Sequence, residues 1–385
     1  MDFSNRSKKD GFTGKEIIVT RNLDFLSELS YENYQTTKYG DINKDGKTSE
    51  LMEELSTGIG FTPISSFRGI FDGQNKKISN LYINSNELYV GFFAEVGSAT
   101  IKNFILNGEI NYIGDRNFSI GGVVGLIHGK CFLDSLEYSG AIGINGQSNS
   151  YAVGGIVGNI NESSNTEVNK CVNKSNIISN IYTGGIVGKN YGKLKIVNCY
   201  NLGDLTLKRA NFLQSYYSVG GIFGCCTRGD VIIENSYNTG IIINELSNVY
   251  SGAGGILGTS GDLNANITNC YNIGKTSSKY LYITPFSGGI QGGFWYNQYK
   301  SNISNCYYDG AKSDRSVGGA TKEYATKLTT NQMQGKEKIE NKDGTSSTLV
   351  ELLNKEIDNN STGADTSSWL RWKQGENGYP TFVEM

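Results

Sequence analysis

The stretch GGIVGKNYGKLKIVNCYNLG, residues 184–203, contains two short motifs whose repetition decides the fold. The first motif is a glycine pair followed by two mostly apolar residues and a third glycine. Further copies lie at 121–125, 154–158, 220–224, 254–258 and 288–292, with a divergent copy at 90–94. The second glycines, at positions 91, 122, 155, 185, 221, 255 and 289, are 30 to 36 residues apart. A regular period of this length indicates a repeat architecture.

The second motif, Asn-Cys-Tyr-Asn-x-Gly, lies between successive glycine pairs. It spans 198–203 and returns, with small changes, at 235–240, 269–274 and 305–310. The segments around it are short, rich in Val, Ile and Tyr, and bounded by Gly, Asn, Ser and Asp, which is typical of strands and turns. No helical periodicity of useful length occurs between residues 101 and 308. Two or three strands per repeat predict that each repeat is one coil of a parallel β-helix.

Stacked coils place equivalent residues in columns along the axis. One column of asparagines should hydrogen-bond from coil to coil at a bend that needs the left-handed conformation: Asn198, Asn235, Asn269 and Asn305. A column of tyrosines should stack: Tyr200, Tyr237, Tyr271 and Tyr307. A column of small residues should face inward: Ser135, Cys171, Cys199, Ser236, Cys270 and Cys306. The glycine pairs should mark a corner with either a positive φ or a close approach of neighbouring backbones.

We therefore expect an all-β protein whose residues 61–315 form a right-handed parallel β-helix of about seven coils. The hand follows from the crossover rule for parallel strands. Residues 1–60 and 316–385 should form small α/β caps, because open strand edges otherwise promote aggregation. Trp369 and Trp372 should close the last coil.

Composition excludes several classes of function. The chain of 385 residues carries a net charge of −2, which provides no field for nucleic acid. Its single histidine, His128, cannot build a zinc site with several imidazoles, and its position after a strand is typical of a turn residue. No apolar run is long enough to cross a membrane. We expect a monomeric module that neither binds nucleic acid nor inserts into a membrane.

The two motifs, in this order, resemble those of the GLUG-repeat proteins. The stretch 67–81 is similar to the opening coil of that family, and Trp369, Trp372 and residues 378–382 are similar to its tail. Such repeats occur in large bacterial surface proteins and beside some IgA-specific metallopeptidases. The resemblance implies an extracellular or cell-surface β-helical module. The H-E-x-x-H motif of a metallopeptidase is not present in this sequence.

The sequence shows neither a signal peptide nor a wall anchor. If the resemblance holds, we therefore expect this chain to be a fragment of a longer exported protein.

Aromatic side chains are the candidate binding residues. Tyrosine and tryptophan are favoured at binding surfaces because they are rigid and amphipathic. The candidates are Tyr216, Tyr217, Tyr280, Tyr282, Trp295, Tyr296 and Tyr299. They could stack on sugars or contact a protein, and the alternative is that they close the core near the last coils.

The stretch 41–49 is similar to a calcium-binding loop. Asp41, Asn43 and Asp45 occupy the first, third and fifth positions, and Gly46 lies at the sharp turn. The twelfth position, where a calcium loop has an acidic residue, is Met52. The alternative is an acidic turn stabilised by its own side chains.

These patterns favour a non-catalytic structural or adhesive module of a bacterial surface protein. It would present a rigid β-helical face to a host or cell-surface glycan or protein. The alternative is a polysaccharide lyase or glycoside hydrolase on the same scaffold, because a fold does not determine a function. Acidic residues are sparse within the repeats and form neither a recurring column nor a tight local pair, which disfavours the enzyme.

Overall fold

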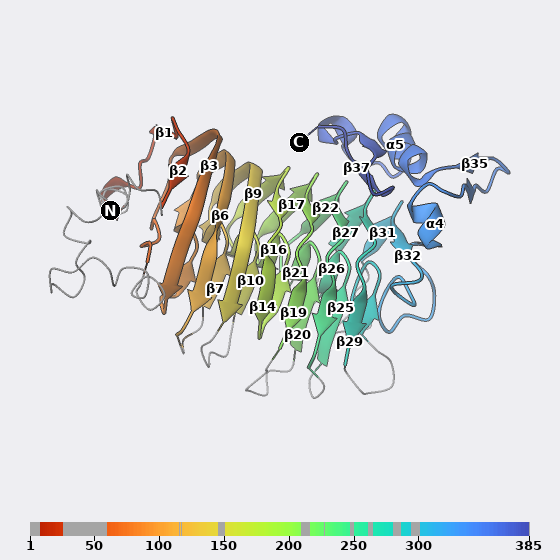
Figure 1. Ribbon diagram of the computed structural model, residues 1–385, viewed down its shortest axis with the longest axis horizontal. Helices are drawn as coiled ribbons and strands as arrows, with labels where there is room; N and C mark the ends of the chain where they lie inside the picture. The colour runs from red at the N-terminus through yellow and green to blue at the C-terminus, as the bar shows by residue number, and fades with distance from the viewer. Residues whose placement is uncertain are drawn as a thin grey trace.

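The structure is a computed structural model of the 385-residue chain. It describes residues 8–25, 60–114, 116, 118–144, 151–208, 216–226, 228–246, 250–260, 265–279, 286–293 and 301–384. These residues form a parallel β-solenoid of about six turns, elongated along its axis (Figure 1). The all-β, parallel architecture predicted from the repeats is therefore confirmed.

Each coil contributes up to three short strands to one large parallel sheet. In one coil these are β17 (Lys193–Val197), β18 (Tyr200–Asn201) and β19 (Leu205–Leu207). Each pairs with a strand of the next coil, so that Tyr200 lies beside Tyr237. The other strands of this sheet in the described residues are β1 (Glu16–Ile18), β2 (Leu23–Asp24), β3 (Ile70–Ser85), β6 (Thr100–Tyr112), β9 (Lys130–Ile144), β12 (Asn165–Asn169), β13 (Val172–Asn173), β14 (Asn176–Ser179), β22 (Val231–Glu234), β23 (Tyr237–Asn238), β24 (Ile242–Asn244), β27 (Ala265–Thr268), β28 (Tyr271–Asn272), β29 (Thr276–Ser278), β31 (Asn302–Ser304), β32 (Tyr307–Asp309) and β33 (Thr326–Leu328).

Two smaller parallel sheets complete each coil. One has seven strands, one for each predicted coil: β4 (Tyr89–Val90), β7 (Phe118–Gly121), β10 (Tyr151–Gly154), β15 (Tyr182–Gly184), β20 (Tyr216–Gly220), β25 (Tyr250–Gly254) and β30 (Ser287–Gly288). The other has six: β5 (Phe93–Gly97), β8 (Val124–His128), β11 (Val157–Ile160), β16 (Val187–Asn190), β21 (Phe223–Cys226) and β26 (Leu257–Ser260). Strands β7, β11 and β16 are buried at every residue.

The glycine pair forms a tight arch between the two smaller sheets. Gly154 ends β10 and pairs with Gly184 of the next coil. A Cβ on Gly155 would overlap the carbonyl oxygen of Gly185 and the side chain of Asn173 in the large sheet. None of the paired glycines has a positive φ. Of the two reasons that the sequence left open for these glycines, close approach is therefore the one that applies.

The parallel ladder begins close to the N-terminus. Strand β1 pairs with β3, with Glu16 beside Ile70, and extends the large sheet. Strand β2 pairs with a later part of β3. Both strands lie within residues 1–60, the range that the sequence analysis assigned to the N-terminal cap. Residues 26–59 lie outside the described residues.

Residues 330–384 lie along the side of the solenoid, and we call them the C-terminal strap. In Figure 1 the strap is the blue segment beside the later coils, with α5 and β37 near strands β22 to β31. Its elements are α4 (Thr330–Met333), β34 (Ile339–Glu340), β35 (Ser346–Ser347), α5 (Leu349–Asn359), a 3-10 turn (Thr366–Ser368), β36 (Trp372–Gln374) and β37 (Pro380–Phe382).

Helix α5 has the sequence signature of a short amphipathic helix. The Thr348 hydroxyl accepts a hydrogen bond from the Glu351 backbone N–H, and the Glu351 carboxylate accepts one from Thr348 N–H, which forms a capping box. Leu349 and Leu353 are buried on one face. The helix ends at Asn360, which adopts the left-handed conformation with φ 46°.

The prediction that Trp369 and Trp372 close the last coil is wrong. They contact Glu234 and Asn235, which lie two coils before the last one. The physical reason is the tyrosine column, because an apolar stripe that crosses several coils offers the strap more area to bury than the end of one coil does.

Candidate interaction ridge

The predicted outer asparagine ladder is present on the large sheet. Asn198, Asn235, Asn269 and Asn305 adopt the left-handed conformation, with φ between 46° and 56°. Each Nδ2 donates to the Oδ1 of the asparagine in the preceding coil, at 2.8 Å from Asn235, 2.7 Å from Asn269 and 2.6 Å from Asn305. Asparagine suits this bend because it tolerates a positive φ and can hydrogen-bond along the axis.

The predicted tyrosine column stacks beside this ladder. The rings of Tyr200 and Tyr237 lie 4.6 Å apart and 7° from parallel. The rings of Tyr237 and Tyr271 lie 5.0 Å apart and 3° from parallel. Burial raises the pKa of Tyr237, Tyr271 and Tyr307 above the ordinary tyrosine value.

From Cys171 to Cys306 the column of small residues faces the interior, as expected. The prediction is wrong for Ser135, which has a φ of 54° like Asn198 and is only half-buried, because the register places Leu136 in the inward position of that coil. The Cys199 thiol accepts a hydrogen bond from the Cys171 backbone N–H at 3.3 Å, and the Ser236 hydroxyl accepts one from Cys199 N–H at 3.0 Å. Burial raises the pKa of Cys171 and Cys270. A buried thiol with a raised pKa is a poor nucleophile, so this column is structural.

A second asparagine ladder lies inside the solenoid, and the sequence analysis missed it. Its members are Asn173, Asn201, Asn238 and Asn272, which are fully buried. The Nδ2 groups of Asn173, Asn201 and Asn238 each donate to the Oδ1 of the next asparagine at 2.7 Å. All four Nδ2 groups also donate to a backbone carbonyl two residues ahead. The signal was the second asparagine of the Asn-Cys-Tyr-Asn motif, which recurs with the same period as the first.

The backbone of the C-terminal strap binds the outer asparagine ladder. Asn198 Nδ2 donates to the carbonyl oxygen of Ser368 at 2.8 Å, and Asn198 Oδ1 accepts from Leu370 N–H at 2.9 Å. Asn235 Nδ2 donates to the Leu370 carbonyl at 2.9 Å. The side-chain amides therefore act on the strap as the peptide groups of a strand edge would.

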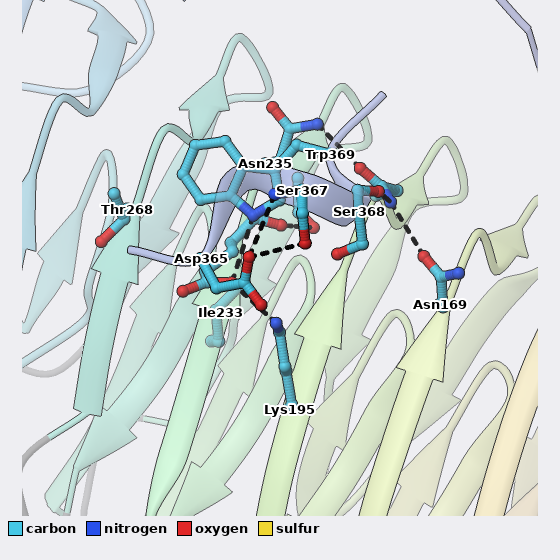
Figure 2. A network of polar contacts seen from close by, with 12 residues as sticks. Asn169, Lys195, Ile233, Asn235, Thr268, Asp365, Ser367, Ser368 and Trp369 are labelled. Atoms are coloured by element: carbon cyan, nitrogen blue, oxygen red, sulfur yellow. Dashed lines mark hydrogen bonds and ion pairs between the residues drawn. The ribbon is translucent and has the colours of Figure 1, made fainter. Parts of the chain in front are cut away.

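Two tryptophans of the strap add hydrogen bonds to the same ridge. Trp369 Nε1 donates to the Glu234 carboxylate at 3.2 Å, and Trp372 Nε1 donates to Asn235 Oδ1 at 2.7 Å. Glu234 also pairs with Lys195, whose Nζ lies 3.3 Å from the carboxylate. Figure 2 shows this part of the strap lying across the ends of neighbouring strands, with Lys195 pointing toward it. Glu234 is buried, so both partners compensate its desolvation.

An apolar cluster completes the contact between strap and solenoid. The rings of Trp372 and Phe382 pack 5.8 Å and 5.6 Å from the ring of Tyr237. The Tyr271 hydroxyl donates to the carbonyl of Pro380, and the Tyr237 hydroxyl lies 3.3 Å from Thr381 Oγ1. The strap thus packs on the tyrosine column and pairs the hydroxyl groups of Tyr237 and Tyr271, whereas the Tyr307 hydroxyl donates to Asn305.

Comparisons with known proteins assign no family to the chain. No protein-family model matches it, and no curated protein matches it. It is similar to a solved structure described as a "putative immunoglobulin A1 protease from Bacteroides ovatus". The two chains are 17% identical with a TM-score of 0.45, over 96% of this chain and 87% of the other. Similarity of this degree assigns no activity.

The structure describes two of the seven candidate binding residues. Tyr217 lies in β20 and is 3% exposed, so it belongs to the core, which was the alternative interpretation. Tyr216 lies beside it in the same strand. The other candidates lie outside the described residues: Tyr280, Tyr282, Trp295, Tyr296 and Tyr299. The calcium-loop residues Asp41, Asn43 and Asp45 lie outside them too, so calcium binding stays a prediction.

His128 is the last residue of β8, and the bend that the sequence predicted at this point follows at Gly129. Its Nδ1 is 3.2 Å from Asn161 Nδ2, and its Nε2 is 3.8 Å from the Glu95 carboxylate. Across the described ranges, no group of three or more His, Cys, Asp or Glu side chains could hold a metal ion. No helix within those ranges is long and apolar enough to cross a membrane.

Proposed function

We propose that this chain is a non-catalytic, rigid module of a bacterial surface protein that presents a β-helical face to a host or cell-surface glycan or protein. The observation that carries the proposal is the outer asparagine ladder, Asn198 to Asn305, which runs unbroken from coil to coil. Side-chain ladders of this kind add to the backbone hydrogen bonds between coils and resist bending. The resemblance to GLUG-repeat proteins supports an extracellular or cell-surface location.

The mechanism of such a module is passive. Neighbouring coils pair in parallel along the large sheet and both smaller sheets. Because each coil is fixed to the next at several points around its perimeter, side chains at its corners and loops are held at a constant spacing. A rigid presenting surface loses little conformational entropy when it binds, and this favours affinity.

Binding is tested at the aromatic stretch that the sequence analysis singled out. We expect Trp295→Ala to reduce glycan-array or cell-binding signals about tenfold or more, as removal of an aromatic anchor does at other interfaces. Phe132→Ala is the matched control, because Phe132 is an exposed aromatic residue on the large sheet. Equal signals for Trp295→Ala and the wild type would show that this stretch binds no ligand.

The enzymatic alternative is tested with a panel of polysaccharides. A lyase or hydrolase would release reducing ends from at least one of them, whereas we expect no release. Release that persists in several independent preparations would replace the proposed function by the enzyme.

A further inference from the structure

The C-terminal strap contacts four consecutive coils. It reaches Asn198, Asn235 and Asn269 through hydrogen bonds of 2.8 Å, 2.9 Å and 3.3 Å to its backbone carbonyls. In the last of these coils, the Thr330 hydroxyl donates to the Asp309 carboxylate at 2.9 Å. In a solenoid each coil otherwise contacts only its neighbours, so stability is a sum of local terms and coils can open one at a time.

We propose that the strap is a longitudinal staple that makes these four coils open as one unit, while the coils on the N-terminal side open separately. The inference goes beyond the proposed function and does not depend on any ligand. It concerns how the module resists local unfolding.

Neighbouring coils share their contacts with the strap. Opening the coil of Tyr237 alone breaks the packing of Trp372 and Phe382 on that ring and the indole hydrogen bond to Asn235. Trp372 also packs on Tyr271 of the next coil, at 5.6 Å between ring centroids. Release of the strap from one coil therefore weakens its contacts with the others. The free energy needed to open any one of these coils therefore includes the loss of strap contacts that all four coils share.

The tyrosine column has the same extent as the strap. The register of the large sheet places Val172, Glu137 and Ile105 in the coils before Tyr200. Ile105 is 37% exposed, and Glu137 pairs with Lys174 at 2.8 Å. Tyrosine occupies this column in the four coils that the strap contacts, and other residues occupy it in these three coils on the N-terminal side. The tyrosine column therefore extends over the same coils as the C-terminal strap that packs on it.

Native-state hydrogen exchange by mass spectrometry on the full chain tests the staple. In the wild type, we expect the strands of the four strapped coils, β17 to β32, to exchange with one common protection factor. Trp372→Phe keeps an aromatic ring, although a smaller one, but removes the indole N–H that donates to Asn235, and should lower protection across all four coils about tenfold. Trp369→Ala with Trp372→Ala should lower it about a hundredfold or more. Strands β3, β6 and β9 should be unchanged.

Two controls keep the test decisive. Ile178→Ala removes an exposed side chain from the same sheet outside the strap, and should leave every protection factor unchanged. If the double variant does not fold, the staple is tested by Trp372→Phe alone, which should lower protection in all four strapped coils and leave β3, β6 and β9 unchanged. The staple is refuted if Trp372→Phe lowers protection only in the coil of Asn235, or equally in β3, β6 and β9, or nowhere.

Discussion

At the scale of the residue, asparagine does two things at one position. Asn235 has a φ of 46°, which a glycine would also accept. A glycine, however, has no side-chain amide that could donate a hydrogen bond to Asn198 or accept one from the indole N–H of Trp372. The corner therefore selects asparagine for its backbone tolerance and its side-chain hydrogen bonds together.

The buried tyrosines predict a stability that falls in alkali. Burial raises the pKa of Tyr237, Tyr271 and Tyr307 above about 10, the ordinary value. Above about pH 10 the unfolded chain loses these protons while the folded chain keeps them. The stabilising contribution is therefore complete below that pH and is lost as pH rises toward the folded pKa. Each tyrosine should lower the free energy of unfolding by about 1.4 kcal/mol per pH unit in this window.

Urea unfolding followed by circular dichroism between about pH 8 and about pH 11 measures this effect. Tyr237→Phe should reduce the slope in the alkaline range, because one ionising group is removed. A tyrosinate absorbance near about pH 10 that is smaller in folded Tyr237→Phe than in the folded wild type would contradict the assignment of Tyr237 to the buried column.

At the scale of the element, the arch of the glycine pair is tightly packed. Gly154 ends β10 and Gly155 follows it before β11, and a side chain at either position would overlap backbone atoms. The same crowding occurs at Gly184, Gly220 and Gly254, each of which pairs in register with a glycine of the next coil. A Cβ on the first glycine of a pair would overlap its own coil, as Gly154 would the Val157 carbonyl oxygen, and a Cβ on the second would overlap the next coil. The glycine repeat is therefore required by close packing and not by backbone conformation.

Gly155→Ala should be strongly destabilising. The new Cβ would overlap the Gly185 carbonyl and the Asn173 amide of the inner ladder, and we expect a loss of about 3 kcal/mol or more. Gly143→Ala is the matched control, because Gly143 lies in β9 with no atom within 4 Å of a new Cβ. Urea unfolding midpoints measure both. Equal midpoints for the two variants would show that the arch is not tightly packed.

At the scale of the molecule, one rod carries a second apolar cluster along its side. The core of the solenoid is formed by inward-facing residues of the large sheet and both smaller sheets, whereas Tyr237, Tyr271, Tyr307, Trp372 and Phe382 form a separate cluster. The strap therefore covers aromatic surface that the solenoid cannot bury by itself.

Deletion of residues 366–385 should cause self-association. The deletion removes Trp369, Trp372 and Phe382 and exposes Tyr237 and Tyr271, and an exposed aromatic patch of this kind promotes aggregation. Light scattering and size-exclusion chromatography measure the outcome. A soluble, folded monomer after the deletion would show that the strap is dispensable as a cover.

Several features could be predicted from the sequence because they depend only on the short motifs that recur in each coil. The spacing of the glycine pairs predicts the coils, and the motif at 198–203 predicts the outer asparagine ladder, the tyrosine stack and the inward thiols. Each of these needs only the assumption that equivalent residues stack. The inner ladder at Asn173, Asn201, Asn238 and Asn272 was open to the same reasoning.

The sequence by itself determined the parallel β-solenoid, because the periodic pattern allows one stacking register. Only the tertiary structure decided that the glycines serve close approach, and that Trp369 and Trp372 lie against Glu234 and Asn235. Those contacts join residues more than 130 positions apart. No repeat encodes the position of a single non-repeated segment, so its place depends on which surface buries most of its aromatic area.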